Sequence, residues 1–484
     1  MDIVTLLKEL VNGLIEAEKD FYQNPIDLHE LETATKATTD AIAAKFISSI
    51  LSNMNEQIYK NSIRKEHYTV QRTDSRTLIS SVGDLTFDCT LYKRKNSEGY
   101  VYLLEEMLKL GKHERFTEKA EEMILTEALK TSYAEAARVL PSKQKITKTT
   151  VMNKVHHIAS DMPMEEAAEK REVDYLFIEA DEDHVAEQHG DSTSPDENSS
   201  FISKLVYIHE GRQDAKGYKA RKELKNTFYL SGVYSGTEGT EVLWKEVGDY
   251  IDKNYNTEAL KRIFISGDGA QWIKGGTEHL DKSLFCADKF HLMKYINIAA
   301  AQMLDEKEDV KNELWHILYS KTKKAKGRFE EYTERMIKSA NHPERIEELR
   351  TFVLGNWAAI RRTLRNKLVG GCSAESHVSH VLSDRLSSRP MGWSQTGADR
   401  MSRLRCYDRN YGREKIIELV RYSRKKERGL RTGTDDEVLK RISVREVTAE
   451  HYDQARSYID RIHASIPGLN AKKTVSIRTH LNML

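Results

Sequence analysis

Strand-like apolar runs alternate with helical stretches in the middle of the chain, and this alternation constrains the fold more than any other feature. The first run, residues 173–180 (VDYLFIEA), is almost continuously apolar, as expected of a strand buried on both faces. Further strands are predicted at residues 205–208, 228–234, 262–266 and 284–287, with a helix at about 240–255. Strands that alternate with helices predict an α/β domain.

The region before this domain is predicted to be mainly helical, with one β-hairpin. Apolar residues recur every three or four positions over residues 3–15 and 28–59, which indicates amphipathic helices. Within residues 76–93, β-branched and aromatic residues flank Gly83, a pattern typical of a hairpin with glycine at its turn. A helical layer that carries a hairpin is therefore expected to precede the α/β domain.

Residues 111–160 are predicted to form a DNA-binding module. Helical periodicity from residue 117 is interrupted at Pro141, and a second short helix is predicted after Thr147, whose hydroxyl suits an N-cap. Two short helices joined by a polar turn resemble a helix-turn-helix, although an ordinary helical pair fits the same pattern equally well. The candidate DNA contacts on the second helix are Lys148, Thr149, Asn153 and Lys154.

The rest of the chain divides by predicted secondary structure and charge. Residues 300–370 are almost entirely helical and charged without a clear strand, which is typical of a helical insertion. The predicted divisions are 1–110 (helical region with the hairpin), 111–160 (DNA-binding module), 161–299 (first part of the α/β core), 300–370 (helical insertion), 371–400 (core helix with a late glutamate) and 401–484 (basic C-terminal region).

Composition excludes several classes of protein. Four widely separated cysteines without a Cys-x-x-Cys pair disfavour a zinc site and a disulfide framework, and favour a reducing cytoplasm. No apolar stretch approaches the ~18 residues that span a bilayer, so no membrane partner is expected. The formal net charge is only +1, yet acids predominate in residues 161–210 and bases in residues 361–430. The chain is therefore charged unevenly along its length.

Three acidic residues form the candidate catalytic site. Asp181 follows the first predicted strand, Asp268 follows a later one, and Glu375 begins a helix that Ser373 is expected to cap. Carboxylate ligands select hard cations such as Mg²⁺ or Mn²⁺, and two such ions support phosphodiester cleavage or transfer. Asp183 competes with Asp181 for the first position. Each acid taken singly is more simply explained as a solvated turn or strand end.

Four motifs occur along the chain in the order YLFIEADEDHVA, ISGDGAQWI, CADKFHLMKYI and GCSAESHVSHVLSDRLSSRPMGWS. Together they resemble the ISLre-type family of bacterial insertion-sequence transposases, and the similarity covers nearly the whole chain. The resemblance implies an α/β, RNase H-like catalytic core with an Asp-Asp-Glu triad, interrupted by a helical insertion before the glutamate. Carried onto this sequence, the triad is Asp181, Asp268 and Glu375, and the cofactor is a pair of Mg²⁺ or Mn²⁺ ions.

His291 matches a histidine that lies close to the scissile phosphate in related transposases, which implies an accessory catalytic role. A histidine at a helix start beside an N-capping Asp288 explains the same residue equally well.

A DNA-gripping surface is expected after Glu375, because arginines bind phosphates and aromatic rings stack on displaced bases. The favoured function is a DDE-type transposase that cuts double-stranded DNA at terminal inverted repeats and joins the ends to target DNA. A homodimer or larger assembly on DNA is expected, in the bacterial cytoplasm or nucleoid. An RNase H-like nuclease without strand transfer and an inactive DNA-binding relic are the alternatives. The candidate contacts are Arg385, Arg389, Trp393 and Arg400.

Overall fold

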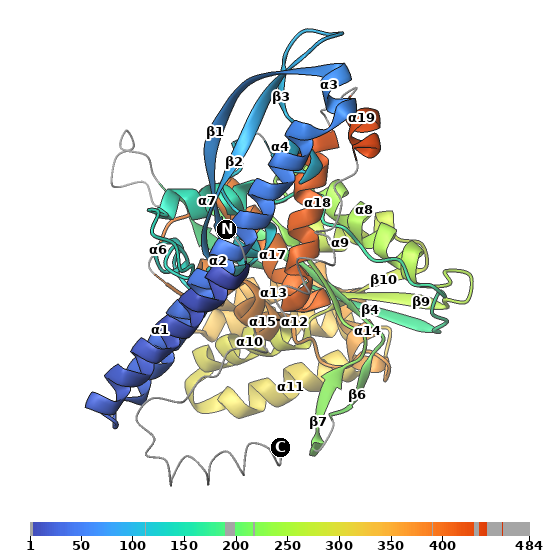
Figure 1. The fold of residues 1–484 in the computed structure, drawn as a ribbon. Coiled ribbons are helices and arrows are strands. Elements are labelled where there is room, and N and C mark those ends of the chain that lie inside the picture. Colours follow the sequence, from blue (N-terminus) through green and yellow to red (C-terminus); the bar gives the residue numbers. More distant parts are fainter. Residues whose placement is uncertain are drawn as a thin grey trace. The chain divides into compact units, whose positions relative to one another are not determined.

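The chain divides into two compact units. The computed structural model describes residues 3–111, 113–188, 199–215, 218–389, 391–429 and 435–442, together with position 457 (Figure 1). Unit 1 comprises Met1–Val151 and Val420–Leu484, and unit 2 comprises Met152–Leu419. The two boundaries fall inside helices α7 (Lys148–His156) and α18 (Ile416–Gly429).

Unit 1 combines a long β-hairpin with a pair of long helices. The helices are α1 (Ile3–Gln23) and α2 (Leu28–Lys60), and the hairpin pairs β1 (Tyr68–Ser80) with β2 (Gly83–Arg94). Gly83 has a φ of 119°, which glycine adopts without strain, at the turn that the sequence predicts. The remaining elements of this unit are β3 (Tyr100–Tyr102), which pairs with β2, and helices α3 (Ser62–His67), α4 (Leu103–Met107), α5 (Glu118–Ala128), α6 (Tyr133–Ala136) and α19 (Asp435–Arg441).

Helix α2 packs on the hairpin through one apolar stripe. Ala44, Leu51 and Ile58 recur every seven residues and join a buried cluster with Leu85 and Phe87 of β2. Residues seven apart lie on the same side of a helix, so this spacing directs one face of α2 to the hairpin.

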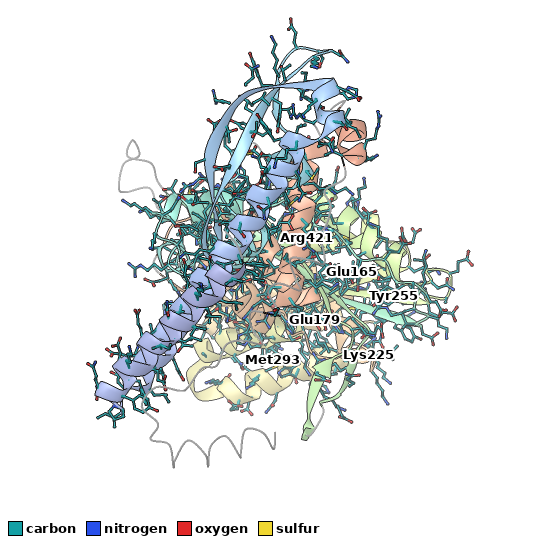
Figure 2. All side chains as sticks on the ribbon, viewed as in Figure 1. Glu165, Glu179, Lys225, Tyr255, Met293 and Arg421 are labelled. Carbon is teal, nitrogen blue, oxygen red and sulfur yellow. The ribbon has the colours of Figure 1, made fainter. Side chains whose placement is uncertain are left out.

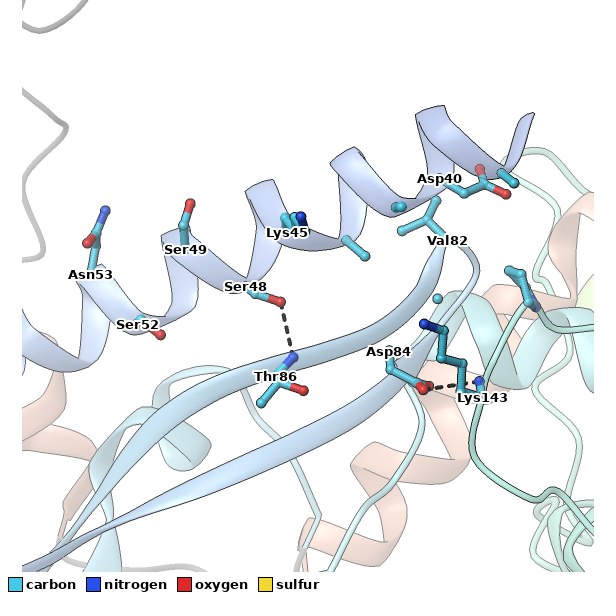
Figure 3. A pocket seen from close by; sticks show the side chains of 15 residues that line it. Asp40, Lys45, Ser48, Ser49, Ser52, Asn53, Val82, Asp84, Thr86 and Lys143 are labelled. Atoms are coloured by element: carbon cyan, nitrogen blue, oxygen red, sulfur yellow. Dashed lines mark hydrogen bonds between the residues drawn. The ribbon is translucent and has the colours of Figure 1, made fainter. Parts of the chain in front are cut away.

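A groove of about 690 Å³ lies between α2 and the turn of the β1–β2 hairpin (Figure 3). Small side chains such as Ala41 and Ala44 line it from α2. One wall is held by Ser48, whose Oγ accepts a 3.1 Å hydrogen bond from the backbone N–H of Thr86. The groove is therefore a consequence of small residues on α2 opposite the hairpin.

Within unit 1, helix α18 is joined to α5 by ion pairs. Arg424 contacts Glu121 at 2.5 Å, and both side chains are more than nine-tenths buried. Arg421 contacts Glu118 at 2.9 Å on the surface. Part of the basic charge in residues 361–430 therefore serves packing within the chain.

Unit 2 is built on a mixed five-stranded sheet. Its strands lie in the order β10 (Ser283–Ala287), β9 (Arg262–Gly267), β4 (Tyr175–Ala186), β5 (Ser200–His209) and β8 (Phe228–Gly232). β4, β5 and β8 pair antiparallel, whereas β4, β9 and β10 pair parallel. Helices α8 (Gly236–Asn254) and α9 (Gln271–His279) provide the crossovers that lead into the two parallel strands.

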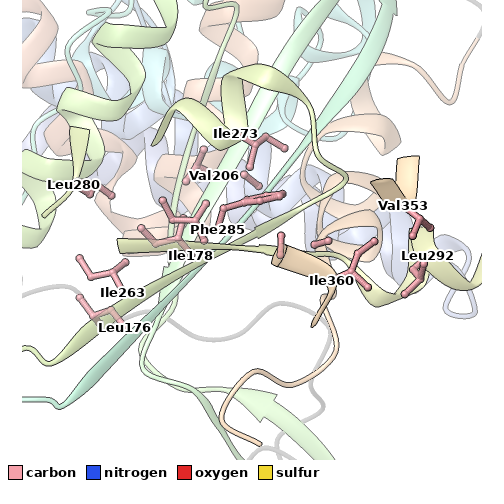
Figure 4. Packing of buried hydrophobic residues seen from close by; sticks show 14 of the residues in the cluster. Leu176, Ile178, Val206, Ile263, Ile273, Leu280, Phe285, Leu292, Val353 and Ile360 are labelled. Carbon is pink, nitrogen blue, oxygen red and sulfur yellow. The ribbon is translucent and has the colours of Figure 1, made fainter. Parts of the chain in front are cut away.

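One face of this sheet carries the main hydrophobic core (Figure 4). Leu176, Ile178 and Ala180 alternate along β4 and are fully buried in the same cluster as Trp244 of α8 and Ile273 of α9. The core continues into a helical block that contains α10 (Lys289–Ala300), η1 (Ala301–Glu306), α11 (Lys307–Tyr319), α12 (Ala325–Ser339), α13 (Pro343–Gly355) and α14 (Trp357–Arg365). Every regular element described within residues 300–370 is helical, as the sequence predicts.

The opposite face of the sheet is covered by the segment after the helical block. Successive side chains of a strand point to opposite faces, so Glu179, Asp181 and Asp183 point away from the core that contains Ala180. Contacts to Glu179 and Asp183 come from this later segment. Its elements are α15 (Ala374–Val378), the π-helical η2 (Ser379–Ser383), α16 (Asp384–Leu386), α17 (Gln395–Tyr411) and the short η3 (Arg413–Lys415).

The end of one strand was predicted wrongly from the sequence, and one pair of strands was missed. Asp181 does not end the first strand, because β4 continues to Ala186 through a ladder with β5. The missed element is an antiparallel pair of strands, β6 (Arg212–Ala215) and β7 (Tyr218–Leu224). Among the described residues, no helix combines the length and apolarity that crossing a membrane requires.

Candidate functional site

Asp181 of β4 and Asp268, the residue directly after β9, lie at corresponding positions beyond the end of the β4–β9 parallel ladder. The last pair of the β4–β9 ladder is Glu179 with Ser266, so two further residues along each strand lead to Asp181 and Asp268. Residues in register on adjacent parallel strands point to the same face of a sheet. The topology therefore brings together two carboxylates that are 87 residues apart in the sequence.

Gly267 permits the close approach of the two strands at this point. A Cβ atom on Gly267 would lie 2.9 Å from the carbonyl oxygen of Ala180 and 2.7 Å from Cδ1 of Ile273. Gly269 follows with a φ of 100°, and the Oδ1 atom of Asp268 accepts a 2.8 Å hydrogen bond from the backbone N–H of Ala270. The turn thus fixes one oxygen of Asp268 and leaves the other for a ligand.

Electrostatics shows that Asp181, Asp268 and His291 share one environment. Burial is the largest cause that raises the pKa of Asp181, to about 6, and the neighbouring charge of Asp268 raises it further. The charge of His291 acts in the opposite direction. A carboxyl with this pKa binds a proton or a cation more readily than a solvated one.

His291 lies on α10 and contacts the residue that caps that helix. Its Nδ1 is 2.8 Å from Oδ2 of Asp288, whose Oδ1 accepts a 2.9 Å hydrogen bond from the backbone N–H of Phe290. The hydrogen bond to Asp288 is the main cause that raises the pKa of His291, and the charges of Asp181 and Asp268 add to it. The capping arrangement and proximity to the two aspartates therefore occur together.

Glu375 is exposed on α15, a short helix that packs on β4. Ser373 does not cap this helix with its side chain, contrary to the sequence prediction, because its Oγ bonds to Glu179 instead. Within the described parts of the chain, no group of three or more His, Cys, Asp or Glu side chains is arranged to hold a metal ion. The structure thus brings Asp181 and Asp268 together without a formed site that includes Glu375.

Glu179, two residues before Asp181 on β4, is a buried carboxylate that was not among the predicted site residues (labelled in Figure 2). It accepts hydrogen bonds from the Tyr207 hydroxyl and from the backbone N–H of Ser373, the latter at 2.6 Å. Its second oxygen is 3.3 Å from Nε2 of His209. Burial opposes the charge of Glu179, but His209 and the other donors outweigh it and lower its pKa to about 2. An acid inside a continuous apolar run was the available sequence signal.

Asp183 faces different partners from Asp181. Its Oδ1 accepts hydrogen bonds from the hydroxyls of Ser383 at 3.0 Å and Ser387 at 2.8 Å. Burial raises the pKa of Asp183, and the two serines oppose that rise. This geometry favours Asp181 over Asp183 as the partner of Asp268.

The candidate DNA contacts divide into surface and buried residues. On α7, Lys148, Thr149 and Asn153 are exposed, Lys154 is half-buried, and Val151 and Val155 form the buried side. The Oγ1 of Thr147 accepts a 3.2 Å hydrogen bond from the backbone N–H of Thr150, as expected of an N-cap.

Two of the four candidates after Glu375 are inside the protein, so direct DNA contact by them is a wrong prediction for this conformation. Arg385 is 2% exposed and Trp393 is 5% exposed, with the guanidinium 4.7 Å from the indole ring centre. The two side chains are thus in cation–π contact with each other inside unit 2. Arg389 is exposed, and Arg400 is half-buried beside Asp399 at 2.6 Å.

The residues that are brought together fit a hard divalent cation. Asp181 and Asp268 offer oxygen ligands only, and the raised pKa of Asp181 indicates a carboxylate whose charge lacks full compensation. All four cysteines are among the described residues, and each is a free thiol. The donor set thus suits Mg²⁺ or Mn²⁺ rather than a thiolate-bound metal.

Comparison with known proteins assigns the family. The model of an uncharacterised protein family, UPF0236, matches residues 21–425. The chain belongs to the UPF0236 family. One member, which carries eleven gene labels in Caldanaerobacter subterraneus subsp. tengcongensis, is 34% identical over 401 residues, covering 83% of this chain and 82% of the relative. Another, with four gene labels in that organism, is 34% identical over 408 residues, covering 84% and 83%.

Among solved structures, the Drosophila P element transposase strand transfer complex matches 74% of this chain and 94% of its own chain. The sequence identity is 14% and the TM-score is 0.21. A TM-score this low does not establish a shared fold.

Proposed function

We propose that this UPF0236 protein is a DDE-type transposase that uses a divalent metal to cut DNA at the ends of a mobile element and to join those ends to target DNA. The observation that carries the proposal is the proximity of Asp181 and Asp268, each two residues beyond the last pair of the β4–β9 parallel ladder. Two carboxylates in this position supply the ligands that metal-dependent phosphoryl transfer needs.

The order of the strands supports an RNase H-like core. If the sheet strands β4, β5, β8, β9 and β10 are numbered 1 to 5 in chain order, they lie side by side in the order 3-2-1-4-5. Strands 1, 2 and 3 pair antiparallel, and strands 4 and 5 run parallel to strand 1. An RNase H-like fold has this order, with its first acid on the central strand and its second after the fourth strand. Asp181 and Asp268 hold those two positions.

Helix geometry supports Glu375 as the third ligand. On α15, His377 stacks on Tyr207 of β5 and bonds to Tyr229 of β8. Residues two apart are separated by about 200° around a helix. Glu375 therefore lies on the flank of α15 turned away from β5 and β8.

The chemistry follows from these positions. Two bound Mg²⁺ or Mn²⁺ ions would activate the attacking oxygen and stabilise the leaving one. Asp181 and Asp268 would hold them, Glu375 would complete the ligand set, and His291, with its raised pKa, would orient the scissile phosphate. The attacking group is water during cleavage and a 3′-hydroxyl during joining.

The family supports mobility of the gene. A relative with eleven gene labels in one organism is what an element that copies itself leaves behind. This observation favours a transposase over a nuclease that cuts without joining.

A cleavage and strand-transfer assay tests the proposal. Purified protein would be incubated with Mg²⁺ or Mn²⁺ and with DNA that carries the ends of its own element, beside the variants Asp268→Asn and Asp281→Asn. The second variant is the control, because Asp281 is an exposed acid beyond α9. Cut and joined products that disappear only with Asp268→Asn are expected. Cutting without joining would indicate the nuclease alternative, and DNA binding without cutting would indicate the inactive relic.

A further inference from the structure

A groove that combines aromatic and basic side chains lies between α10 and α11 in unit 2. It has a volume of about 230 Å³ and is lined by Lys289, Met293, Asn297, Lys311, Trp315 and Tyr319. The rings of Trp315 and Tyr319 are 6.0 Å apart, and Tyr319 is 47% exposed. Met293, labelled in Figure 2, is 42% exposed. Large apolar side chains with this exposure are available to a ligand.

Lysines without an ion-pair partner among the described residues surround this groove. Six lysines lie on its walls, on the outer side of α10, or in the turn after Tyr319, and none of them forms an ion pair with a described residue. Two of the three acids of α11, Glu308 and Asp309, lie in its first turn, at the end of that helix away from Tyr319. The third, Glu313, pairs with Arg328 at 3.1 Å and not with a lysine of the groove. The six are Lys289, Lys294, Lys311, Lys321, Lys323 and Lys324.

The groove lies beside the candidate active site, across the width of α10. Lys289 and Met293 are on one flank of this helix, and His291 is about 200° from Lys289 around the axis. A strand leaving His291 would therefore cross the exposed side of α10, where Phe290 is 47% exposed, and reach the groove after about 10 Å, the width of a helix.

We propose that this groove binds an unpaired stretch of DNA next to the site of cleavage. A base would stack on Trp315 or Tyr319, and the adjoining phosphates would lie against the lysines. Bases within a duplex are already stacked on each other, so an aromatic groove of this size selects unpaired nucleotides. The inference rests on the proposed function, because it takes DNA as the partner.

Binding measurements without a divalent metal test the groove separately from cleavage. Fluorescence anisotropy would compare two duplexes of the same end sequence, one fully paired and one with a short unpaired thymidine flank. Tyr319→Ala is expected to weaken binding of the flanked duplex about tenfold and to leave the paired duplex unchanged. Tyr319→Phe is expected to restore binding, because phenylalanine keeps the ring.

Lysine variants provide the charge control. Lys323→Ala with Lys324→Ala is expected to reduce the salt dependence of binding to the flanked duplex. Lys245→Ala with Lys253→Ala removes the same charge from exposed positions of α8 and is expected to leave it unchanged. Equal effects of the two double variants would overturn the proposal.

Photo-crosslinking locates the unpaired strand without any substitution. A 4-thiothymidine placed in the flank is expected to crosslink to a peptide from residues 307–326, as identified by mass spectrometry. A crosslink elsewhere, or a loss with Tyr319→Ala that is equal for the paired and flanked duplexes, would refute the groove while leaving the cleavage assay unaffected. If the unsubstituted protein binds the unpaired flank but does not cleave DNA with either metal, the proposed catalytic site is refuted and the groove is not.

Discussion

Replacing Asp181 by asparagine should stabilise unit 2 at alkaline pH, although it should abolish metal-dependent cleavage. The pKa of Asp181 rises from 3.8 to about 6, chiefly through burial. Each tenfold change in proton affinity is worth about 1.4 kcal/mol, so the ionised native state is destabilised by about 3 kcal/mol. Asparagine keeps the size and can still accept the 2.9 Å hydrogen bond from the Glu182 backbone N–H.

The pH dependence follows from the sign of this difference. The folded protein binds a proton at Asp181 more tightly than the unfolded chain does, so wild-type stability rises as the pH falls from above 6 toward 4. Asp181→Asn removes this dependence. The variant should therefore exceed the wild type by about 3 kcal/mol at pH 8 and by almost nothing at pH 4.

Urea denaturation followed by tryptophan fluorescence measures this difference in unit 2 alone. All five tryptophans lie within it: Trp244, Trp272, Trp315, Trp357 and Trp393. Asp252→Asn is the matched control, because Asp252 is exposed on α8 and its loss should change the free energy of unfolding by less than about 0.5 kcal/mol.

Repeating the urea denaturation with Mg²⁺ connects the stability of unit 2 to metal binding. At pH 8, Mg²⁺ should raise the free energy of unfolding of the wild type and not that of Asp181→Asn, since a ligand that binds only the folded state stabilises it. A variant that is no more stable than the wild type at pH 8, or one whose advantage persists at pH 4, would refute the burial of an ionised carboxylate at this position.

Three other substitutions test the packing around the site and in unit 1. Gly267→Ala should destabilise unit 2 by about 1–3 kcal/mol in urea, because its Cβ would meet the Ala180 carbonyl oxygen at 2.9 Å; unchanged stability would contradict the close strand approach. Glu179→Gln should lower stability at neutral pH. Because the pKa of Glu179 is lowered to about 2, the wild-type advantage should persist above pH 5 and shrink as the pH falls through the folded pKa, whereas a deficit independent of pH would argue against a charged Glu179. Arg424→Ala should cost about 3–5 kcal/mol in thermal unfolding followed by circular dichroism, because it leaves Glu121 buried and unpaired; a loss below 1 kcal/mol would show that the pair is hydrated.

The strands that carry the site were largely predictable from sequence, because a strand covered on both faces is an apolar run whichever strands pair with it. The apolar run at residues 173–180 and the shorter run at 262–266 both form strands of the sheet. The end of β4 was not predictable in the same way. The acidic second half of β4 is extended because it pairs with β5; Asp183, for example, lies opposite Ser203. That pairing depends on residues about twenty positions further along the chain.

Burial of charged side chains was the hardest feature to predict. Arginine and tryptophan are residue types found on DNA-binding surfaces, yet Arg385 and Trp393 stack on each other inside unit 2. An arginine is usually exposed, so residue type favoured the wrong interpretation. Glu179 illustrates the same limit, because its partners Tyr207 and Ser373 come from a neighbouring strand and from a segment 194 residues away.

The candidate site therefore depends on two contacts that sequence spacing does not encode. Gly267 lets β9 approach Ala180, and this approach sets Asp268 beside Asp181. Glu179 then holds Ser373 on the same face of β4, two residues before Glu375. Since Glu179 and Asp181 are alternate residues of one strand, the start of the helix that carries Glu375 is fixed next to the paired aspartates. Glu179 thereby holds the residue that precedes α15 on the face of β4 that also carries Asp181.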